Sequence, residues 1–270
     1  MADVDDQEAT RGVWRRGSYE IVGDWFADGS RAVLAGSGGP LPLDGLELLD
    51  VACGTGAVAI EAARRGARVT GLDLTPELLD IARRRAEQAG VEVRWVEGTF
   101  EDLSGLGEFD AVVSSFGVMF AADPPAVAAQ LAAACRDDGF VGVAAWDRRG
   151  ALGGPTADLR ALLPDGGAGP DVTAWAEPDA VGTYFAGTTL TVADHHRGRV
   201  AIQFASASVA ADEFVEHSGG WAALFEYLEA QGHGPAARRA LEAHLGERSD
   251  PVPAGIAVRA DYGVTRLTRR

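Results

Sequence analysis

The hydrophobic and polar positions along the first half of the chain follow two periods in turn. Short apolar runs at residues 46–51, 69–73, 91–96, 109–115 and 140–146 have the length and composition of buried strands. Between them, residues 57–67, 76–89 and 125–135 repeat apolar side chains at helical spacing, and the last two stretches begin with proline. This alternation predicts a parallel sheet covered by helices on both faces.

The segments on either side of this core have a different pattern. Residues 14–34 carry apolar side chains at helical spacing before a Gly/Pro-rich linker at 36–42, and a second Gly/Pro-rich stretch at 148–178 predicts an insertion or flexible cap. Further elements are predicted at 178–186 (helix), 190–193 and 199–204 (strands), 211–231 and 235–245 (helices) and 256–264 (strand). The chain thus divides into residues 1–40, 41–147 and 148–270, and we expect 150–169 to be a mobile cover.

The pattern of residues 46–73 predicts a strand, a glycine turn, a helix and a second strand that ends on an acidic residue. Gly54 and Gly56 allow a tight turn and a close approach of the backbone to a ligand. Asp73 ends the second strand 19 residues after Gly54, the separation at which a carboxylate meets the hydroxyls of a ribose. These residues predict a site for a nucleotide-type cofactor.

The glycine pattern alone leaves the cofactor open, because Gly54-x-Gly56-x-x-Ala59 also fits a dinucleotide fingerprint. Asp50 lies inside the first strand, where a carboxylate would add no favourable interaction with the pyrophosphate of a dinucleotide. It favours S-adenosylmethionine, which presents an ammonium and a sulfonium to this end of the sheet. The chain has no lysine, which excludes the common Tyr-x-x-x-Lys reductases, Schiff-base enzymes and Walker-type nucleotide sites.

Four segments resemble, in order, the class I S-adenosylmethionine-dependent methyltransferases, in particular the small-molecule branch similar to ubiquinone and menaquinone biosynthesis methyltransferases. They are DVACGTG at 50–56, GLDLTPELL at 71–79, EGTFEDL at 97–103 and FDAVVSSFGVMF at 109–120. The resemblance implies an α/β fold with a Rossmann-like, doubly wound, mostly parallel seven-stranded sheet, whose final two strands form an antiparallel edge. Residues 1–40 would form a helical lid over S-adenosylmethionine.

The resemblance also implies where the ligands bind. The cofactor-binding residues would be Asp50, Ala52, Gly54, Gly56, Asp73, Leu74, Thr99, Phe100 and Ser115, and the acceptor would meet Trp14, Tyr19, Phe116, Met119 and Trp146. Ala52 replaces the first glycine of many members, and Thr99 replaces an Asp that accepts more strongly from adenine. Methyl transfer needs alignment and exclusion of water, and a base only where the acceptor must lose a proton, so no catalytic residue is assigned.

Net charge and composition limit the classes of partner that we expect this protein to bind. A net charge of −16 repels phosphate backbones, so no nucleic-acid partner is expected. No apolar run approaches the roughly 18 residues of a membrane span, and the N-terminus is acidic, so we expect a cytoplasmic protein without a membrane partner.

The cysteines and histidines predict no metal site. Cys53 and Cys135 are expected to be reduced, with Cys53 open to alkylation. We expect His195 and His196 to lie in a solvated hairpin. No histidine has metal-ligand spacing, and no metal is predicted.

The sequence therefore predicts a methyltransferase that uses S-adenosylmethionine to methylate O, N or C of a small organic acceptor, for instance a secondary metabolite. Two alternatives stay open: an NAD(P)-dependent oxidoreductase, supported by the glycine fingerprint and Asp73, and a non-catalytic binder of S-adenosylmethionine. The motifs fix neither the acceptor nor the oligomeric state.

Overall fold

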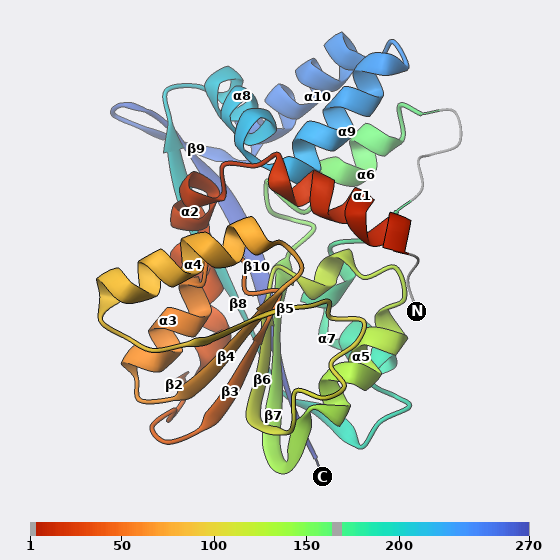
Figure 1. Cartoon of the computed structure of the whole chain (residues 1–270). Helices are drawn as coiled ribbons and strands as arrows, with labels where there is room; N and C mark the ends of the chain where they lie inside the picture. Colours follow the sequence, from red (N-terminus) through yellow and green to blue (C-terminus); the bar gives the residue numbers. More distant parts are fainter. Residues whose placement is uncertain (1–3, 164–168, 270) are drawn as a thin grey trace.

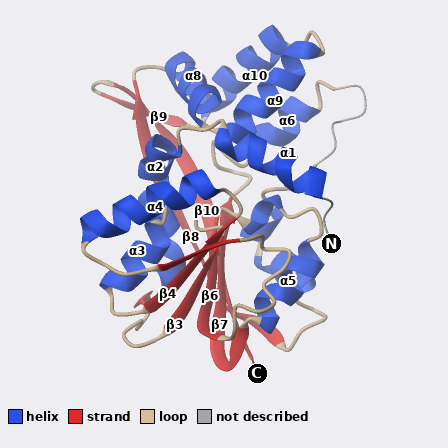
Figure 2. Ribbon diagram, in the orientation of Figure 1, coloured by secondary structure: helices blue, strands red, loops and turns tan. Residues whose placement is uncertain are grey.

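A computed structural model describes residues 4–163 and 169–269 and shows one large twisted sheet (Figures 1 and 2). Its strand order is β5-β4-β3-β6-β7-β10-β8. The parallel strands are β3 (Glu47–Val51), β4 (Arg68–Asp73), β5 (Arg94–Glu97), β6 (Phe109–Ser115) and β7 (Cys135–Trp146). Strand β10 (Gly255–Arg269) runs antiparallel to β7 and to β8 (Leu190–Phe204). The predicted sheet is confirmed, and β9 (Ser249–Val252) adds a strand beside β10.

Helices cover both faces of the sheet, which explains the continuous apolar runs of its central strands. Helices α3 (Ala57–Arg64) and α4 (Pro76–Ala89) lie on one face, and α5 (Pro124–Ala133) and α7 (Pro178–Tyr184) lie on the other (Figure 1). Leu48, Leu49, Val112 and Val113 on the two middle strands are fully buried, because neighbours cover a central parallel strand on both sides.

Strand β7 begins earlier than the sequence predicts, at Cys135 instead of residue 140. Its first residues, Arg136, Asp137 and Asp138, are polar, so hydrophobicity alone does not mark them as strand. They are strand because Cys135 pairs with Phe109, and a register shift follows before Ala111 pairs with Phe140. Helix α5 accordingly ends at Ala133, two residues before the predicted end.

A helical cap stands beyond the carboxyl ends of the parallel strands (Figure 1). It comprises α6 (Pro155–Arg160), α8 (Ala207–His217), α9 (Gly219–Ala230) and α10 (Gly234–Glu247). The single helix predicted at 211–231 is two helices, because Ser218 is extended and precedes the first residue of α9. The two strands predicted at 190–193 and 199–204 are one, because the polar residues between them pair with β10 at the sheet edge.

The described part of residues 148–178 is packed, which corrects the expectation of an insertion outside the core. Ala151, Leu159 and Trp175 are at most 1% exposed, and the short helices α6 and η3 (Ala174–Ala176) hold these side chains against the sheet and cap. Residues 164–168 of the predicted mobile cover lie outside the described residues. The mobility of the rest stays a prediction.

The N-terminal helices lie between the cap and the strand ends (Figure 1). Helix α1 (Val4–Arg15) contacts α9, and α2 (Tyr19–Arg31) contacts α3, α8 and β8. A 3-10 turn, η1 (Ala32–Leu34), and a small hairpin of β1 (Ala35–Gly36) and β2 (Gly39–Pro40) lead into β3. The sequence missed most of α1, whose first turns are acidic and lack an apolar stripe. In the part of the chain that the structure describes, no helix is long and apolar enough to cross a membrane.

Candidate active site

The carboxyl ends of five parallel strands meet at one edge of the sheet, directly below α1 and α2 (Figure 1). Residues predicted to bind a cofactor or acceptor follow these ends: the turn 52–56 after β3, Asp73 ending β4, Thr99 after β5, Ser115 ending β6 and Trp146 ending β7. Parallel sheets bind their ligands at this edge. The structure therefore brings the predicted residues together, although they are spread over about a hundred positions.

The two glycines of the turn face different surroundings. Gly54 has a left-handed φ of 53°, and a Cβ placed on it would meet nothing within 4 Å. Gly56 has a φ of 83°, but its Cβ would lie 2.8 Å from Cη2 of Trp95 and 3.1 Å from Ala82. Gly56 is therefore small so that Trp95 can pack against the turn, and the binding of the cofactor by its backbone stays a prediction.

Ala52 also adopts the left-handed region, with a φ of 56°. This conformation favours glycine, so it explains why many members of the resembling family have glycine at this position. Ala52 carries the smallest side chain that has a Cβ. That Cβ lies close to Gly117, because a Cβ placed on Gly117 would be 2.4 Å from it. The departure from the motif thus preserves the turn at the cost of some backbone strain.

Two buried carboxylates stand behind the turn. Asp50 is 1% exposed, and its Oδ2 accepts a hydrogen bond of 3.0 Å from the amide of Ala59. Burial raises the pKa of Asp50 to about 8, against the opposing effect of that amide, and the neighbouring charge of Asp73 raises it further. Asp50 is therefore largely protonated at neutral pH until a cation approaches.

Asp73 fixes the turn to the end of β4. One carboxylate oxygen accepts from the amide of Gly54 at 2.8 Å, and the other accepts from the amide of Thr75 at 2.9 Å. Burial raises the pKa of Asp73, while these amides oppose the shift. Each carboxylate oxygen has a second lone pair, so Asp73 can still accept from two hydroxyl groups.

The remaining cofactor candidates surround this centre. Leu74, Thr99 and Phe100 are half-buried, and the hydroxyl of Thr99 accepts from the amide of Glu101 at 3.3 Å. Ser115 Oγ is buried and has no hydrogen-bond partner among the described residues. A buried hydroxyl without a protein partner is free to bond a ligand or an ordered water.

Arginines that the sequence analysis did not single out tie the N-terminal helices to this edge. Arg11 on α1 donates to the carbonyl of Leu74 at 3.1 Å and to Glu97 at 2.8 Å. Arg85 on α4 donates to the hydroxyl of Thr55 at 3.2 Å and to the carbonyl of Glu20 at 2.9 Å. No local pattern reveals these contacts, because the partners are 30 to 86 positions apart.

An aromatic cluster follows β6 and β7. The rings of Phe116 and Trp146 stack with centroids 3.7 Å apart, and Phe26 of α2 meets Trp146 edge-on at 4.8 Å. Tyr262 of β10 lies edge-on to Phe116 at 6.1 Å. The structure thus joins two predicted acceptor residues and adds Phe26 and Tyr262, which were missed because apolar periodicity does not distinguish site residues from core.

The other three acceptor candidates occupy different places. Trp14 packs edge-on against Phe120 at 4.7 Å, and the hydroxyl of Tyr19 accepts from the amide of Gly219 at 3.1 Å. Burial raises the pKa of Tyr19, and the charge of Asp73 adds to the shift, so Tyr19 lies within electrostatic reach of Asp73. Met119 is 3% exposed and belongs to the main hydrophobic core.

Three further expectations concern the histidine pair, the cysteines and metal ligands. His195 and His196 lie within the continuous strand β8, so the predicted hairpin is wrong, and His195 Nδ1 is 3.1 Å from the hydroxyl of Thr265. Both cysteines are free and buried, as predicted. Burial raises the pKa of Cys53 well above its usual value, which argues against the expected alkylation. Within residues 4–163 and 169–269, no three His, Cys, Asp or Glu side chains are placed to hold a metal.

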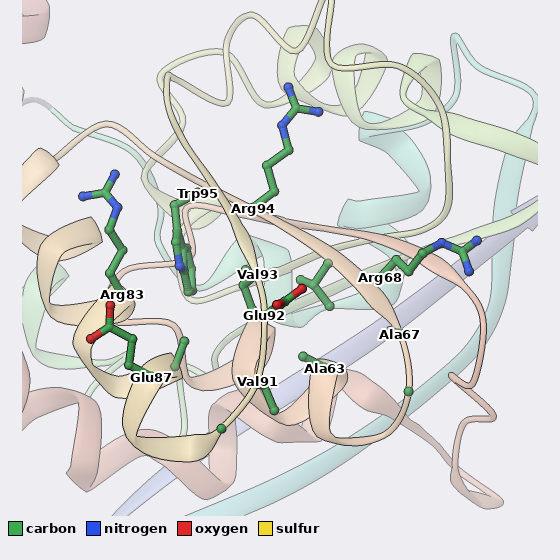
Figure 3. Close-up of a pocket in the computed structure, with 14 residues that line it drawn as sticks. Ala63, Ala67, Arg68, Arg83, Glu87, Val91, Glu92, Val93, Arg94 and Trp95 are labelled. Carbon is green, nitrogen blue, oxygen red and sulfur yellow. The ribbon is translucent and has the colours of Figure 1, made fainter.

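A pocket of about 820 Å³ lies near the amino ends of β4 and β5, away from this edge (Figure 3). Arg68, Arg83 and Arg94 line it, but their side chains spread in different directions, so no charged cluster converges on the space. Trp95 separates this pocket from Gly56. The strand-end edge, where the polar groups converge, is the better candidate for chemistry.

The comparisons with known proteins agree with this geometry. A family of methyltransferase domains matches residues 48–139. An uncharacterized protein of Mycobacterium tuberculosis is 34% identical over 212 residues, which cover 77% of this chain and 76% of the relative. A ubiquinone biosynthesis O-methyltransferase of Cereibacter sphaeroides is 44% identical over 86 residues, or 32% of this chain and 35% of that enzyme.

The fold also matches a solved structure. Magnesium protoporphyrin IX methyltransferase of Synechocystis, with bound S-adenosylmethionine, gives a TM-score of 0.52 at 18% identity over 76% of this chain and 94% of that one. The chain belongs to the class I S-adenosylmethionine-dependent methyltransferases. The oxidoreductase alternative is therefore not retained, and the cofactor is S-adenosylmethionine.

The residues present fit this cofactor. When bound, S-adenosylmethionine supplies an electrophilic methyl group on a sulfonium. In this methyltransferase, the open face of Gly54, the two carboxylates and the unpartnered hydroxyl of Ser115 offer a backbone approach, counter-charge and a hydrogen bond at one edge. We expect Asp73 to hold the ribose, and Asp50 to favour the cationic end.

The shifted pKa of Asp50 predicts that cofactor binding releases a proton. At pH 7 the carboxyl of Asp50 is mostly protonated in the free protein, and a nearby ammonium favours its ionised form. Calorimetry with S-adenosylhomocysteine, repeated in buffers of different ionisation enthalpy, should show release that approaches one proton. Asp50→Asn keeps an oxygen for the amide of Ala59 and should abolish the release.

The same shift sets the pH dependence of stability without ligand. Because the pKa of Asp50 is raised in the folded protein from its usual value of 3.8, the folded state binds a proton that the unfolded chain lacks between about pH 4 and pH 8. The contribution of Asp50 to stability is therefore fully present below about pH 4 and is lost progressively as pH rises to about 8. Identical pH profiles of thermal unfolding for wild type and Asp50→Asn would contradict the assignment.

Proposed function

We propose that this methyltransferase transfers the methyl group to a small acceptor that carries an aromatic ring and binds between the N-terminal helices and the ends of β6 and β7. The observation that carries the proposal is the stacked pair of Phe116 and Trp146 at those strand ends, next to Ser115. Aromatic side chains bind planar rings through offset stacking and edge-to-face contacts, which add to the burial of apolar surface.

The backbone supports a functional role for Phe116. Its φ of 58° lies in the left-handed region, which is a strained conformation for a bulky residue and costs about 1–3 kcal/mol. Phe116 is half-buried and packs against the edge of the main hydrophobic core. We propose that its conformation holds the ring near the strand ends, where the transferred methyl group would be presented.

The surrounding elements would exclude water from the reaction. Helix α2 contributes Phe26 above Trp146, and the hydroxyl of Tyr19 accepts from Gly219 at the start of α9, which links the N-terminal helices to the cap. Methyl transfer gains from such enclosure because alignment of the two reactants supplies much of the catalysis. We propose that α1 and α2 act as a lid and that the cap completes the acceptor pocket. The charge of −16 disfavours a nucleic-acid acceptor.

An acceptor panel tests the proposal. The protein would be incubated with S-adenosylmethionine and sets of phenols, quinols, aromatic amines, aliphatic acids and duplex DNA, with release of S-adenosylhomocysteine as the readout. We expect turnover within the aromatic sets. Turnover confined to aliphatic acids or DNA would overturn the aromatic acceptor, and tight cofactor binding without turnover in any set would favour a non-catalytic binder.

Once an aromatic acceptor is known, Phe116→Leu should raise its KM about 2- to 13-fold, from the 0.5–1.5 kcal/mol of a lost aromatic pair. The affinity for S-adenosylhomocysteine should stay unchanged, because the ring lies at the acceptor end of the site. Tyr227→Leu is the matched control, since Tyr227 is 51% exposed on the cap. An unchanged KM in Phe116→Leu would place the acceptor elsewhere.

A further inference from the structure

Arg11 makes two contacts that together span a gap between strand ends. Its Nε donates to the carbonyl of Leu74 at 3.1 Å, just after the end of β4. Its terminal nitrogen donates to the carboxylate of Glu97 at 2.8 Å, at the end of β5. A third nitrogen lies 3.7 Å from Glu8 on the same helix, and the side chain is 27% exposed. The guanidinium is thus held in one orientation by three groups.

The register of the sheet places the two groups that Arg11 contacts beside Asp73. Asp73 and Glu97 are direct partners in the parallel pair β4–β5, and the amide of Gly98 donates to the carbonyl of Asp73 at 3.0 Å. Leu74 and Glu97 therefore flank Asp73 along the chain and across the sheet. A ribose bound to Asp73 must come close to Arg11 unless α1 leaves its position.

We propose that Arg11 is a cofactor-binding residue, which covers the adenosine portion of S-adenosylmethionine with its planar guanidinium. The inference rests on the assignment of Asp73 to the ribose. A guanidinium stacks well on aromatic ring faces and is always charged, so it suits the exposed side of a purine. Thr99 accepts only weakly from adenine, and contact with Arg11 would supply part of the missing recognition.

Arg15 lies one turn further along the same helix, and its contacts only attach α1 to neighbouring helix surfaces. It contacts the side chains of Glu77 at 2.8 Å and Glu8 at 3.5 Å, both on exposed helix surfaces. Such exposed pairs contribute little free energy. Arg11 differs because it binds a main-chain carbonyl at a strand end, inside the edge where the cofactor lies.

The test compares Arg11→Met with Arg15→Met in the full chain. Calorimetry measures the Kd of S-adenosylhomocysteine and of 5′-methylthioadenosine, which has the adenosine but lacks the amino-acid end. We expect Arg11→Met to weaken both ligands by about the same factor, roughly 3- to 30-fold, and Arg15→Met to leave both within about twofold of wild type. Hydrogen exchange should slow in α1 when wild type binds either ligand.

Each other outcome has a distinct meaning. Equal losses in Arg11→Met and Arg15→Met would show that Arg11 only fastens the helix, and a loss confined to S-adenosylhomocysteine would move its contact to the amino-acid end. Faster exchange in α1 on binding would show that the helix leaves the site. Each of these results overturns the inference, whereas failure of wild type to bind either ligand would overturn the cofactor site itself.

Discussion

Asp73→Asn should weaken the binding of S-adenosylhomocysteine about 10- to 150-fold, the largest loss expected from a single side chain at the cofactor site. A carboxylate that accepts from ribose hydroxyls contributes about 1.5–3 kcal/mol as a charged acceptor. The structure adds a second reason, because the same carboxylate anchors the amides of Gly54 and Thr75. An amide in place of one oxygen turns an acceptor into a donor, so one anchor of the turn is lost as well.

Thr99→Ala serves as the comparison, since it removes a neutral hydroxyl that already accepts from Glu101. Its expected loss is about 2- to 13-fold, from 0.5–1.5 kcal/mol. Calorimetry would give both affinities, and circular dichroism would verify that both variants are folded. Equal affinities for Asp73→Asn and wild type would refute the assignment of Asp73 to the ribose.

Gly54→Val and Gly56→Val should fail in opposite ways, although the glycines are two residues apart. A branched side chain at Gly56 would be driven into Trp95 and Ala82 at a φ of 83°, which combines backbone strain of about 1–3 kcal/mol with overpacking of about 1–3 kcal/mol. We therefore expect Gly56→Val to lower the free energy of unfolding by about 2–6 kcal/mol.

At Gly54 the new side chain would enter open space, so only the backbone strain of about 1–3 kcal/mol remains. That open space faces the strand-end edge, and Gly54→Val should therefore abolish binding of S-adenosylhomocysteine while the protein stays folded. Urea unfolding and calorimetry on both variants separate the two effects. Retained cofactor binding in a folded Gly54→Val would show that this face of the turn is not the ligand side.

The turn at residues 52–56 is held from below and is open on one side. Asp73 fixes the turn from the end of β4, Trp95 of β5 packs against it at Gly56, and we propose that the cofactor binds at the open side of Gly54. A rigid support beneath an open backbone holds the ligand contacts in place before the ligand arrives. Arg85 adds a contact from α4 to the hydroxyl of Thr55, which couples the turn to α2 through Glu20.

The sequence by itself determined the elements whose signals are local. Apolar runs and proline-started helices marked 76–89 and 109–115 with the bounds that the structure has. The glycine turn, Asp50 and Asp73 predicted a cofactor site at the strand ends, because a tight turn at a strand end and an acid at the end of the next strand are constraints within about 20 residues. Parallel alternation then required these strand ends to meet.

Only the tertiary structure decided the features that depend on distant partners. Residues 194–198 are strand because β10 pairs with them. Leu159 and Trp175 are core because α6 packs against α10, and η3 packs against β7, β10 and α7. A side chain at Gly56 would meet Trp95 of a distant strand, which no spacing within the motif reveals. The contact of Arg11 with Leu74 and Glu97 joins residues up to 86 positions apart, and such pairs arise from the packing of whole elements.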